Sequence, residues 1–311
     1  FVGIGGIGMS GIAEVLLNLG YKVQGSDIAE SATTRRLAGL GMKVAIGHRA
    51  DNIGNAQVVV VSSAVKKDNP EVLAARARLV PVVRRAEMLG ELMRLKWSIA
   101  VGGTHGKTTT TSMLALILTE AGMAPSFVIG GEVNEIGTNA RWTGSELFVI
   151  EADESDGSFL ELSLQAGIVT NVEADHLDHF GTVEAIHAGF DRFVSGIDGP
   201  VVVCADDPGS ARLAERHPKA ITYGTTAGAD YTITDLRSDA GRMQFTVSER
   251  GRVLGPVIVP QRGIHNARNA TAAIAMAREL GAPFEAAATA LARFGGVARR
   301  FDFRGREHGV D

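Results

Sequence analysis

The chain of 311 residues has very little cysteine and no excess of positive charge. Its one cysteine, Cys204, has no partner for an internal disulfide, and the apolar run before it predicts a buried strand in a reducing compartment. A formal net charge of -4 gives no broad basic surface for nucleic acid. No apolar stretch approaches the roughly 20 residues that span a bilayer, and the opening residues lack the pattern of a signal segment. We therefore expect a cytoplasmic protein that binds neither nucleic acid nor membrane.

The residues that are abundant indicate an α/β protein of more than one domain. Hydrophobic residues make up 45% of the chain and 38 residues are glycine, which is typical of packed strands and helices joined by tight turns. The length exceeds that of one average domain. Residues 1–5 begin inside what resembles a strand entering a glycine turn, so we expect that some native N-terminus precedes them.

Short apolar runs alternate with helical patterns along most of the chain, as in Ile12, Val15, Leu16 and Leu19 before Gly20. This alternation predicts βαβ units and a parallel sheet. The predicted strands are 21–24, 43–46, 57–61 and 79–83, then 98–101, 147–152, 167–172, 201–205 and 220–223. Period-2 alternation between residues 231 and 260 predicts an antiparallel flank. We predict a Rossmann-like domain at 1–95 and a P-loop ATPase-type domain with a mainly parallel sheet at 96–298.

A phosphate-binding loop is predicted where the strand at 98–101 runs into a helix. The loop consists of Gly102, Gly103, Thr104, His105, Gly106, Lys107, Thr108 and Thr109. Its glycines let backbone N–H groups converge on phosphate, Lys107 adds positive charge, and the Thr108 hydroxyl can bind Mg²⁺. The loop is one residue shorter than the common P-loop pattern. A glycine-rich turn with an incidental lysine is the alternative, but consecutive threonines are poor helix formers.

Acidic and histidine residues follow two of the predicted strands. Residues 151–156 follow one strand and residues 173–179 follow another. Ligands bind beyond the carboxyl ends of strands in open α/β sheets, and phosphoryl transfer needs Mg²⁺ held by hard oxygen ligands. We predict metal-ligand roles for Glu151 and His176, with a solvated acidic loop as the alternative. His176 and His179 lack the further ligands of a structural zinc site, so no zinc is predicted.

Six ordered motifs together resemble the Mur ligase family over essentially the whole chain. They are GIGGIGMSG at 3–11, GTHGKTT at 103–109, EADESD at 151–156, DHLD at 175–178, HNARNAT at 265–271 and GVARRF at 296–301. The resemblance implies that Lys107 holds the phosphates of ATP, that Thr108 and Glu151 bind one Mg²⁺, and that His176 binds a second. It also implies that Asn266 and Asn269 lie near adenine and that Arg300 lies near the ATP phosphates. For Asn269, a helix-capping or surface role is the alternative.

The resemblance implies a reaction in peptidoglycan precursor synthesis. Within the family the chain is similar to the branch that joins L-alanine to the lactyl carboxylate of UDP-N-acetylmuramate, using ATP and forming an acyl phosphate. The rival hypotheses are a recycling ligase that adds a peptide to the same UDP-sugar acid, a more distant folylpolyglutamate-type ligase, and a non-catalytic nucleotide-binding module.

Two departures from the family pattern affect these expectations. Several relatives carry a carbamylated lysine after the histidine motif, but residues 176–200 contain no lysine, so we predict no modified lysine. The family also has a third domain that binds the incoming amino acid. We expect residues 299–311 to be its start, and we expect this chain alone to be a poor ligase.

The first glycine loop supports two hypotheses. Gly3, Gly5 and Gly8, with Asp27 about twenty residues on, match the dinucleotide fingerprint of an NAD-dependent dehydrogenase. The family resemblance instead makes this loop the cradle of the UDP pyrophosphate. The implied substrate-binding residues are Gly5, Gly6, Gly8, Ser10, Asp27, His48, Ser62 and Ser63. A dehydrogenase has no need of a second phosphate loop with lysine and Mg²⁺ ligands, which favours the ligase. For His48, a hydrogen bond within its own loop is the alternative.

Overall fold

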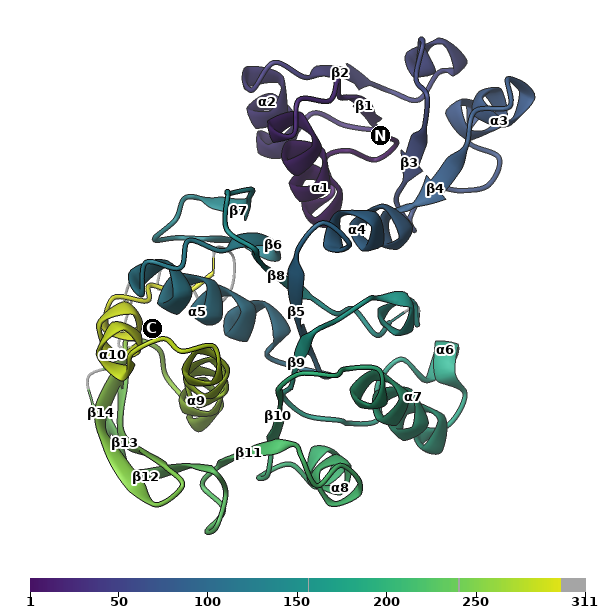
Figure 1. The fold of residues 1–311 in the computed structure, drawn as a ribbon. Helices are drawn as coiled ribbons and strands as arrows, with labels where there is room; N and C mark the ends of the chain where they lie inside the picture. Colours follow the sequence, from purple (N-terminus) through teal and green to yellow (C-terminus); the bar gives the residue numbers. More distant parts are fainter. Residues whose placement is uncertain (156, 240, 298–311) are drawn as a thin grey trace, which may run out of the picture.

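The computed structural model describes residues 1–155, 157–239 and 241–297. Two units follow one another along the chain (Figure 1), an N-terminal unit from α1 to α4 and a central unit from β5 to α10. The N-terminal unit contains α1 (Ile7–Asn18), β1 (Gln24–Asp27), α2 (Ala32–Gly39), β2 (Lys43–Ile46), η1 (Ala50–Ile53), β3 (Val59–Val61), α3 (Pro70–Ala77), β4 (Val82–Arg84) and α4 (Arg85–Met93).

The central unit is larger and contains most of the strands. It contains β5 (Trp97–Gly102), α5 (Lys107–Glu120), β6 (Ser126–Val133), β7 (Thr138–Arg141), β8 (Leu147–Glu151), η2 (Ser158–Glu161), β9 (Ala166–Val169), α6 (Leu177–Phe180), α7 (Val183–Ser195), β10 (Val201–Cys204), α8 (Pro208–Arg216), β11 (Ile221–Gly224), β12 (Tyr231–Asp239), β13 (Arg242–Glu249), β14 (Arg252–Val259), α9 (Ile264–Glu279) and α10 (Phe284–Ala292).

Local sequence explains where several of these helices begin. Asn69 accepts a hydrogen bond from the N–H of Glu71 and Pro70 opens α3, while Asp207 accepts one from Ser210 and Pro208 opens α8. Both pairs combine a side-chain cap with a proline at the first helical position, where no backbone donor is needed. Helix α5 differs, because its N-cap is Gly106 in the left-handed region (φ 86°), with no side-chain cap among the described residues. The start of α5 therefore depends on Gly106, because its left-handed backbone favours glycine.

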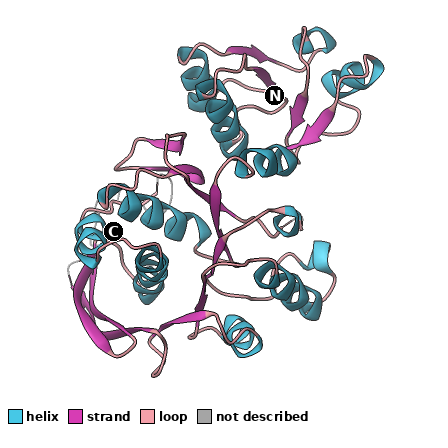
Figure 2. Cartoon of the chain, in the orientation of Figure 1, coloured by secondary structure: helices cyan, strands magenta, loops and turns pink. Residues whose placement is uncertain are grey.

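The sheets confirm the predicted α/β class. In the N-terminal unit β1 pairs with β2 and β3 pairs with β4, both in parallel, and Val2 bridges β1 and β3. In the central unit ten strands form one sheet in the order β14-β13-β12-β11-β10-β9-β5-β8-β6-β7. Strands β12, β13 and β14 pair antiparallel, as predicted, and β7 pairs antiparallel with β6. Figure 2 shows these strands as one curved band that runs through the unit.

Helices cover both faces of the large sheet (Figure 1). Helices α5, α9 and α10 pack on one face, where their buried side chains include Leu114, Ile274 and Leu291. Helices α7 and α8 pack on the other face, and that core continues into α1 and α4 through Ile12 and Leu89. The two units therefore share a hydrophobic core, and burial of apolar area stabilises their contact.

The predicted position of the first strand is wrong. We expected residues 21–24, whereas β1 runs over Gln24–Asp27 and pairs with Lys43–Ile46. Gly25 lies against Ile4, and a Cβ there would come within 2.5 Å of the Ile4 Cδ1 atom. A glycine inside a strand commonly marks such a close approach of the backbone. The strand therefore occupies a polar-looking segment that the apolar pattern does not mark.

Candidate active site

The predicted phosphate loop joins β5 to α5 at the point where the order of the sheet reverses. Strand β5 lies between β9 and β8, both parallel to it, so the carboxyl ends of all three strands meet at one edge. Ligands of open α/β sheets bind at this switch point. Gly103 (φ 125°) and Gly106 (φ 86°) have backbone angles that favour glycine. The loop therefore joins a strand to a helix at the residues that the sequence predicts.

Residues at the end of β9 hold the loop in shape. Asn171 accepts a hydrogen bond from the His105 N–H (2.8 Å) through Oδ1, and its carbonyl accepts one from the Thr104 N–H (3.1 Å). Thr170 donates to the His105 carbonyl (2.6 Å), and Thr104 accepts from the Glu173 N–H (2.9 Å). The Thr104 and His105 N–H groups are used in these bonds, and a loop held in this way keeps its remaining backbone donors in place without a cost at binding.

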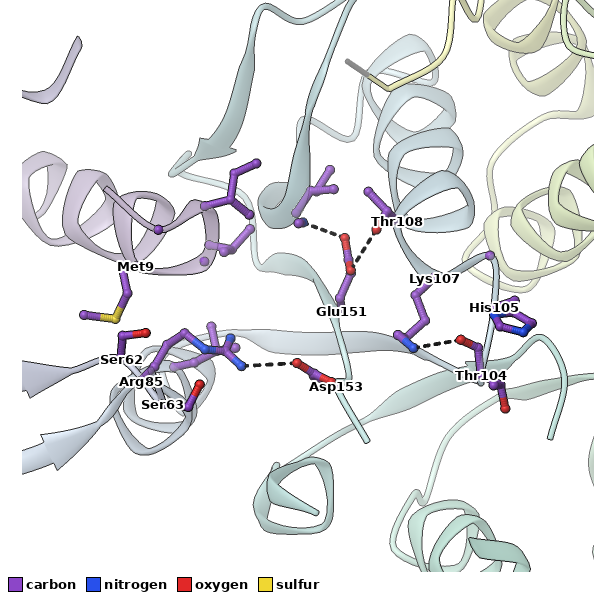
Figure 3. Close-up of a pocket in the computed structure, with 18 residues that line it drawn as sticks. Met9, Ser62, Ser63, Arg85, Thr104, His105, Lys107, Thr108, Glu151 and Asp153 are labelled. Carbon is purple, nitrogen blue, oxygen red and sulfur yellow. Dashed lines mark hydrogen bonds and ion pairs between the residues drawn. The ribbon is translucent and has the colours of Figure 1, made fainter. Parts of the chain in front are cut away.

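Lys107 lies at the first position of α5, with its ammonium group turned into the loop. It donates to the carbonyls of Gly103 (2.7 Å) and Thr104 (3.3 Å) and to Glu154 Oε1 (2.8 Å), contacts that Figure 3 shows in part. The Glu154 side chain is only 3% exposed. Burial raises the pKa of the Glu154 carboxyl, and the Lys107 ammonium opposes that shift. These bonds thus hold the Lys107 ammonium group in place beside the phosphate loop.

Thr108 and Glu151 come together, as predicted. The Thr108 hydroxyl donates to Glu151 Oε2 (3.1 Å), and Glu151 Oε1 accepts from the Gly130 N–H (2.6 Å). A hydroxyl and a carboxylate at a helix N-terminus are hard oxygen donors, and Mg²⁺ is commonly held by one or two such groups together with water and phosphate oxygens. The pair therefore fits one Mg²⁺ beside a bound triphosphate.

His176 lies beside the same buried carboxylate as Lys107. Its Nε2 is 3.6 Å from Glu154 Oε1 and 3.9 Å from Asp175 Oδ2, and its backbone is left-handed (φ 53°). Within residues 1–155, 157–239 and 241–297, no group of three or more His, Cys, Asp or Glu side chains is arranged to hold a metal ion. The role of His176 as a ligand of a second Mg²⁺ remains a prediction.

The first glycine loop is hydrogen-bonded to the carboxylate of Asp27. Asp27 Oδ2 accepts from the Gly5 N–H (2.7 Å), and a Cβ at Gly5 would approach that oxygen to 2.8 Å. Ser10 is buried and donates to the Ile7 carbonyl (2.9 Å). His48 Nδ1 lies 3.0 Å from Ser26 Oγ and 3.3 Å from Glu71 Oε1. The structure shows local hydrogen bonds for Asp27, Ser10 and His48, so their contacts with substrate remain predictions.

A cavity of about 580 Å³ lies between the two units and joins the two glycine loops (Figure 3). The predicted substrate residues that line it are Gly6, Gly8, Ser62 and Ser63, and the predicted nucleotide residues are Thr104, His105, Gly106, Lys107 and Thr108. Arg85, at the start of α4, also lines it and lies 3.7 Å from Asp153 of the central unit. A ligand in this cavity would contact the first glycine loop and the phosphate loop together.

A second cavity of about 150 Å³ opens on the other side of Gly106. Its lining includes Thr109, His265, Asn266 and Asn269, so the predicted adenine residues come together with the phosphate loop. Asn266 donates to the Arg262 carbonyl (2.7 Å). Asn269 lies close to Gly106, because a Cβ built on Gly106 would be 2.7 Å from the Asn269 Oδ1 atom. Arg300 and the predicted domain start at 299–311 lie outside the described residues.

The structure places in the site several residues that the sequence motifs do not single out. Arg85 carries no motif, and Glu154 was not separated from the other acids of residues 151–156. Glu154 is buried while Asp153 is about half exposed, a difference that follows from packing. Gly130 belongs to a strand that was not predicted.

None of the described helices is long and apolar enough to cross a membrane.

Comparisons with known proteins agree with this geometry. Residues 1–97 match the model of the Mur ligase family catalytic domain, and residues 101–277 match the Mur ligase middle domain. All of the chain aligns, at 54% and 53% identity, with UDP-N-acetylmuramate–L-alanine ligases of Acidiphilium cryptum (strain JF-5) and Geobacter sp. (strain M21), and spans 67% and 68% of their lengths.

Solved structures show the same fold. UDP-N-acetylmuramate-alanine ligase of Thermotoga maritima is 32% identical with a TM-score of 0.89, over 99% of this chain and 71% of that one. The UDP-N-acetylmuramate:L-alanyl-gamma-D-glutamyl-meso-diaminopimelate ligase of Neisseria meningitides is 30% identical with a TM-score of 0.86. That match covers 96% of this chain and 98% of the other chain. The two family models together match most of the residues, and the chain therefore belongs to the Mur ligase family.

Proposed function

We propose that this chain carries the UDP-sugar-binding and ATP-binding domains of a ligase that joins L-alanine to the lactyl carboxylate of UDP-N-acetylmuramate in peptidoglycan precursor synthesis. The observation that carries this proposal is the cavity lined by both glycine loops, since it would bring the acceptor carboxylate and the ATP phosphates together. The names of the relatives at 54% and 53% identity support the choice of substrates. The family models, which match residues 1–97 and 101–277, support domains at 1–95 and 96–298.

The residues of this chain would bind and orient the reactants. Backbone donors of the phosphate loop would hold the triphosphate, Lys107 would stabilise charge on its terminal phosphoryl group, and the first glycine loop would hold the UDP pyrophosphate. Thr108 and Glu151 would hold a Mg²⁺, which when bound neutralises charge on phosphate oxygens. Asn266 and Asn269 would contact adenine, His176 a second Mg²⁺, and Arg300 the ATP phosphates. Transfer of phosphoryl to the carboxylate gives an acyl phosphate, which the amine of alanine attacks with loss of phosphate.

Positioning dominates this kind of catalysis. Phosphoryl transfer requires little covalent chemistry of the protein, so no nucleophilic side chain is needed. The loop is already held by Thr170 and Asn171, and Lys107 is already fixed by Glu154. Donors held in place in this way stabilise developing charge without reorganising during the reaction.

A recycling ligase that adds a peptide to the same UDP-sugar acid is the second candidate. The likeness to the Neisseria peptide ligase supports it, with a TM-score of 0.86 over 96% of this chain, although the Thermotoga maritima alanine ligase scores higher, at 0.89 over 99%. Both candidates use the same UDP-sugar and the same nucleotide. They differ in the amine that attacks, so a full-length enzyme supplied with alanine or with a tripeptide would distinguish them by which product forms.

Calorimetric titration tests the shared part of the proposal. We expect the chain to bind UDP-N-acetylmuramate, to bind an ATP analogue with Mg²⁺, and not to bind NAD. Binding of NAD without the UDP-sugar would overturn the proposal in favour of a dehydrogenase. Binding of both expected ligands with no turnover in the full-length enzyme would instead identify a non-catalytic module.

A further inference from the structure

We propose that the β6–β7 hairpin couples the two glycine loops and that Asn139 is the positioning residue at its contact with the first loop. The hairpin comprises Ser126–Val133 and Thr138–Arg141 at one edge of the large sheet. Figure 1 shows it between α1, which follows the first glycine loop, and α5, which follows the phosphate loop. This inference rests on the proposed function, because it concerns how the two proposed ligands affect one another.

Asn139 reaches from β7 into the N-terminal unit. Its Nδ2 donates to the carbonyl of Ile7, the first residue of α1 (2.9 Å), and its Oδ1 accepts from Arg36 Nη2 of α2 (3.2 Å). Asn139 is only 5% exposed, and Arg36 is itself paired with Glu14 of α1 (2.5 Å). A buried amide with both ends hydrogen-bonded fixes orientation strongly, because a loss of either partner leaves a polar group unsatisfied.

The backbone of α1 also packs directly on the hairpin. A Cβ at Gly11 would lie 3.1 Å from Val128 Cγ1, 3.3 Å from Ala140 Cβ and 3.3 Å from Asn139 Nδ2. These distances leave little room for α1 to slide across the hairpin without moving it. A shift of the first glycine loop would therefore be transmitted to β6 and β7.

The other side of the hairpin contacts the proposed Mg²⁺ site. Regular pairing of β6 with β7 is interrupted between Val128 and Val133, and within this stretch the Gly130 N–H donates to Glu151 Oε1 (2.6 Å). Gly131 follows, and a Cβ there would be 3.3 Å from Thr108 Cγ2. The orientation of Glu151 and the space beside Thr108 thus depend on where β6 lies.

The tip of the hairpin contacts the segment beside the proposed adenine cavity. Val133 forms an antiparallel bridge with Val297, the Asn134 amide donates to the Gly295 carbonyl (3.2 Å), and Glu135 accepts from the Gly295 N–H. Val297 also lines the 150 Å³ cavity with Asn266 and Asn269. One hairpin therefore contacts the first glycine loop, the carboxylate of the phosphate site and the wall of the second cavity.

These contacts predict that each ligand raises the affinity of the other. A ligand on the first glycine loop and a ligand beside Glu151 both favour one position of the hairpin, so binding of the first ligand favours binding of the second. Couplings between sites typically amount to about five- to 150-fold. We expect at least about a fivefold increase in affinity for UDP-N-acetylmuramate when a saturating ATP analogue and Mg²⁺ are present, and the same factor in the reverse titration, because binding coupling is reciprocal.

The test compares the unmodified chain with Asn139→Ala, Asn139→Asp and a control, Glu161→Gln. Asn139→Asp keeps the side-chain shape and the acceptor for Arg36 but removes the donor to Ile7, so it serves where the alanine variant unfolds. Glu161 forms another contact between the units, an exposed ion pair with Arg84 (3.0 Å). In both Asn139 variants we expect the coupling factor to fall below about twofold, whatever change the substitution makes in the affinity for each ligand alone. The control should keep the full coupling.

Two results would overturn the inference while leaving the proposed function intact. One is binding of both ligands by the unmodified chain without coupling between them. The other is coupling that persists in both Asn139 variants, which would mean that it passes through other contacts. If the unmodified chain binds neither ligand, the proposed function fails and this inference fails with it.

Discussion

The two glycine loops follow the same order of elements, a strand, a glycine turn and a helix, but they are held differently. The first loop is held by the Asp27 carboxylate and by backbone hydrogen bonds from Gly3 and Ile4 to the Ser26 carbonyl, and it lies beside two-stranded sheets joined through Val2. The phosphate loop follows β5, an inner strand of a ten-stranded sheet, and is held by Thr170 and Asn171 at the end of β9. A glycine turn alone therefore indicates a ligand that contains phosphate. The lysine and the surrounding carboxylates indicate which phosphate-containing ligand binds there.

Removal of the lysine is the largest change that this comparison suggests. In Lys107→Ala the phosphate loop is still held by Thr170 and Asn171, but it loses its cation and the bonds from that cation to the Gly103 and Thr104 carbonyls. Hydrogen bonds to charged groups are worth about 1.5–3 kcal/mol, so we expect affinity for an ATP analogue with Mg²⁺ to fall by about 10- to 100-fold. Affinity for the UDP-sugar alone should stay within about twofold. Calorimetric titration measures both.

The lysine variant needs a matched control because Glu154 would lose its partner. Breaking a buried ion pair by removing one member can cost about 3–5 kcal/mol of stability. In the double variant Lys107→Ala with Glu154→Gln, the remaining side chain is neutral, so stability should partly recover while nucleotide affinity stays low. Recovery of nucleotide affinity in the double variant would show that Lys107 acts through the fold and not through phosphate.

The pH-dependent ion pair between Asp206 and Arg268 gives the next largest effect. Burial raises the pKa of the Asp206 carboxyl, but hydrogen bonds from Thr225, Thr226 and Arg268 outweigh it and lower the pKa to about 2. Since the folded-state pKa is below the ordinary value, this stabilisation is complete above about pH 4 and is lost as the pH falls towards 2. The shift corresponds to about 2 kcal/mol of unfolding free energy. Arg268 lies between Asn266 and Asn269 on α9.

Urea unfolding between pH 6 and pH 2.5 would measure this contribution. Asp206→Asn should be less stable than the unmodified chain at pH 6, and the difference should shrink as the pH falls below 4. Asp198, an exposed carboxylate of the same unit, provides the control, because Asp198→Asn should leave the profile unchanged. A constant difference between Asp206→Asn and the unmodified chain at every pH would contradict the assignment.

The sequence predicted the phosphate loop well because its features are local. Strands buried on both faces are uninterrupted apolar runs, and the prediction for residues 98–101 lies within β5 (Trp97–Gly102). The carboxylates that follow such strands meet at one sheet edge whatever the loops between them do, so Glu151 was expected at the ligand-binding edge, and the family resemblance implied its pairing with Thr108. Among the consecutive threonines, Thr111 donates back to the Lys107 carbonyl and Thr108 donates to Glu151, whereas the buried Thr110 hydroxyl has no hydrogen-bond partner among the described residues.

The β6–β7 hairpin could not be predicted in the same way. Two adjacent glycines, Gly130 and Gly131, interrupt the apolar run of β6, and its pairing with β7 is irregular. Glycine inside a strand weakens the pattern while allowing close approach of other groups, here Glu151, Thr108 and Val297. The strand that contacts Glu151 and Thr108 is therefore one that the apolar pattern does not mark. Contacts such as Asn139 with Ile7 join positions 132 apart and depend on tertiary packing.

The smallest expected effect concerns the first glycine loop and sharpens the same comparison. Asp27→Asn replaces a carboxylate that accepts from the Gly5 and Ile28 N–H groups with a neutral amide. Charge-assisted hydrogen bonds are about twice as strong as neutral ones, so we expect the UDP-sugar to bind about three- to tenfold more weakly, a loss of about 1 kcal/mol. Nucleotide affinity should be unchanged, since the phosphate loop has its own supports. Glu30→Gln, which alters an exposed ion pair with Arg35 in the same unit, should change neither affinity. An unaltered UDP-sugar affinity in Asp27→Asn would mean that the backbone of the first loop holds its shape without the carboxylate, and the contrast between the two loops would then be one of ligand chemistry alone.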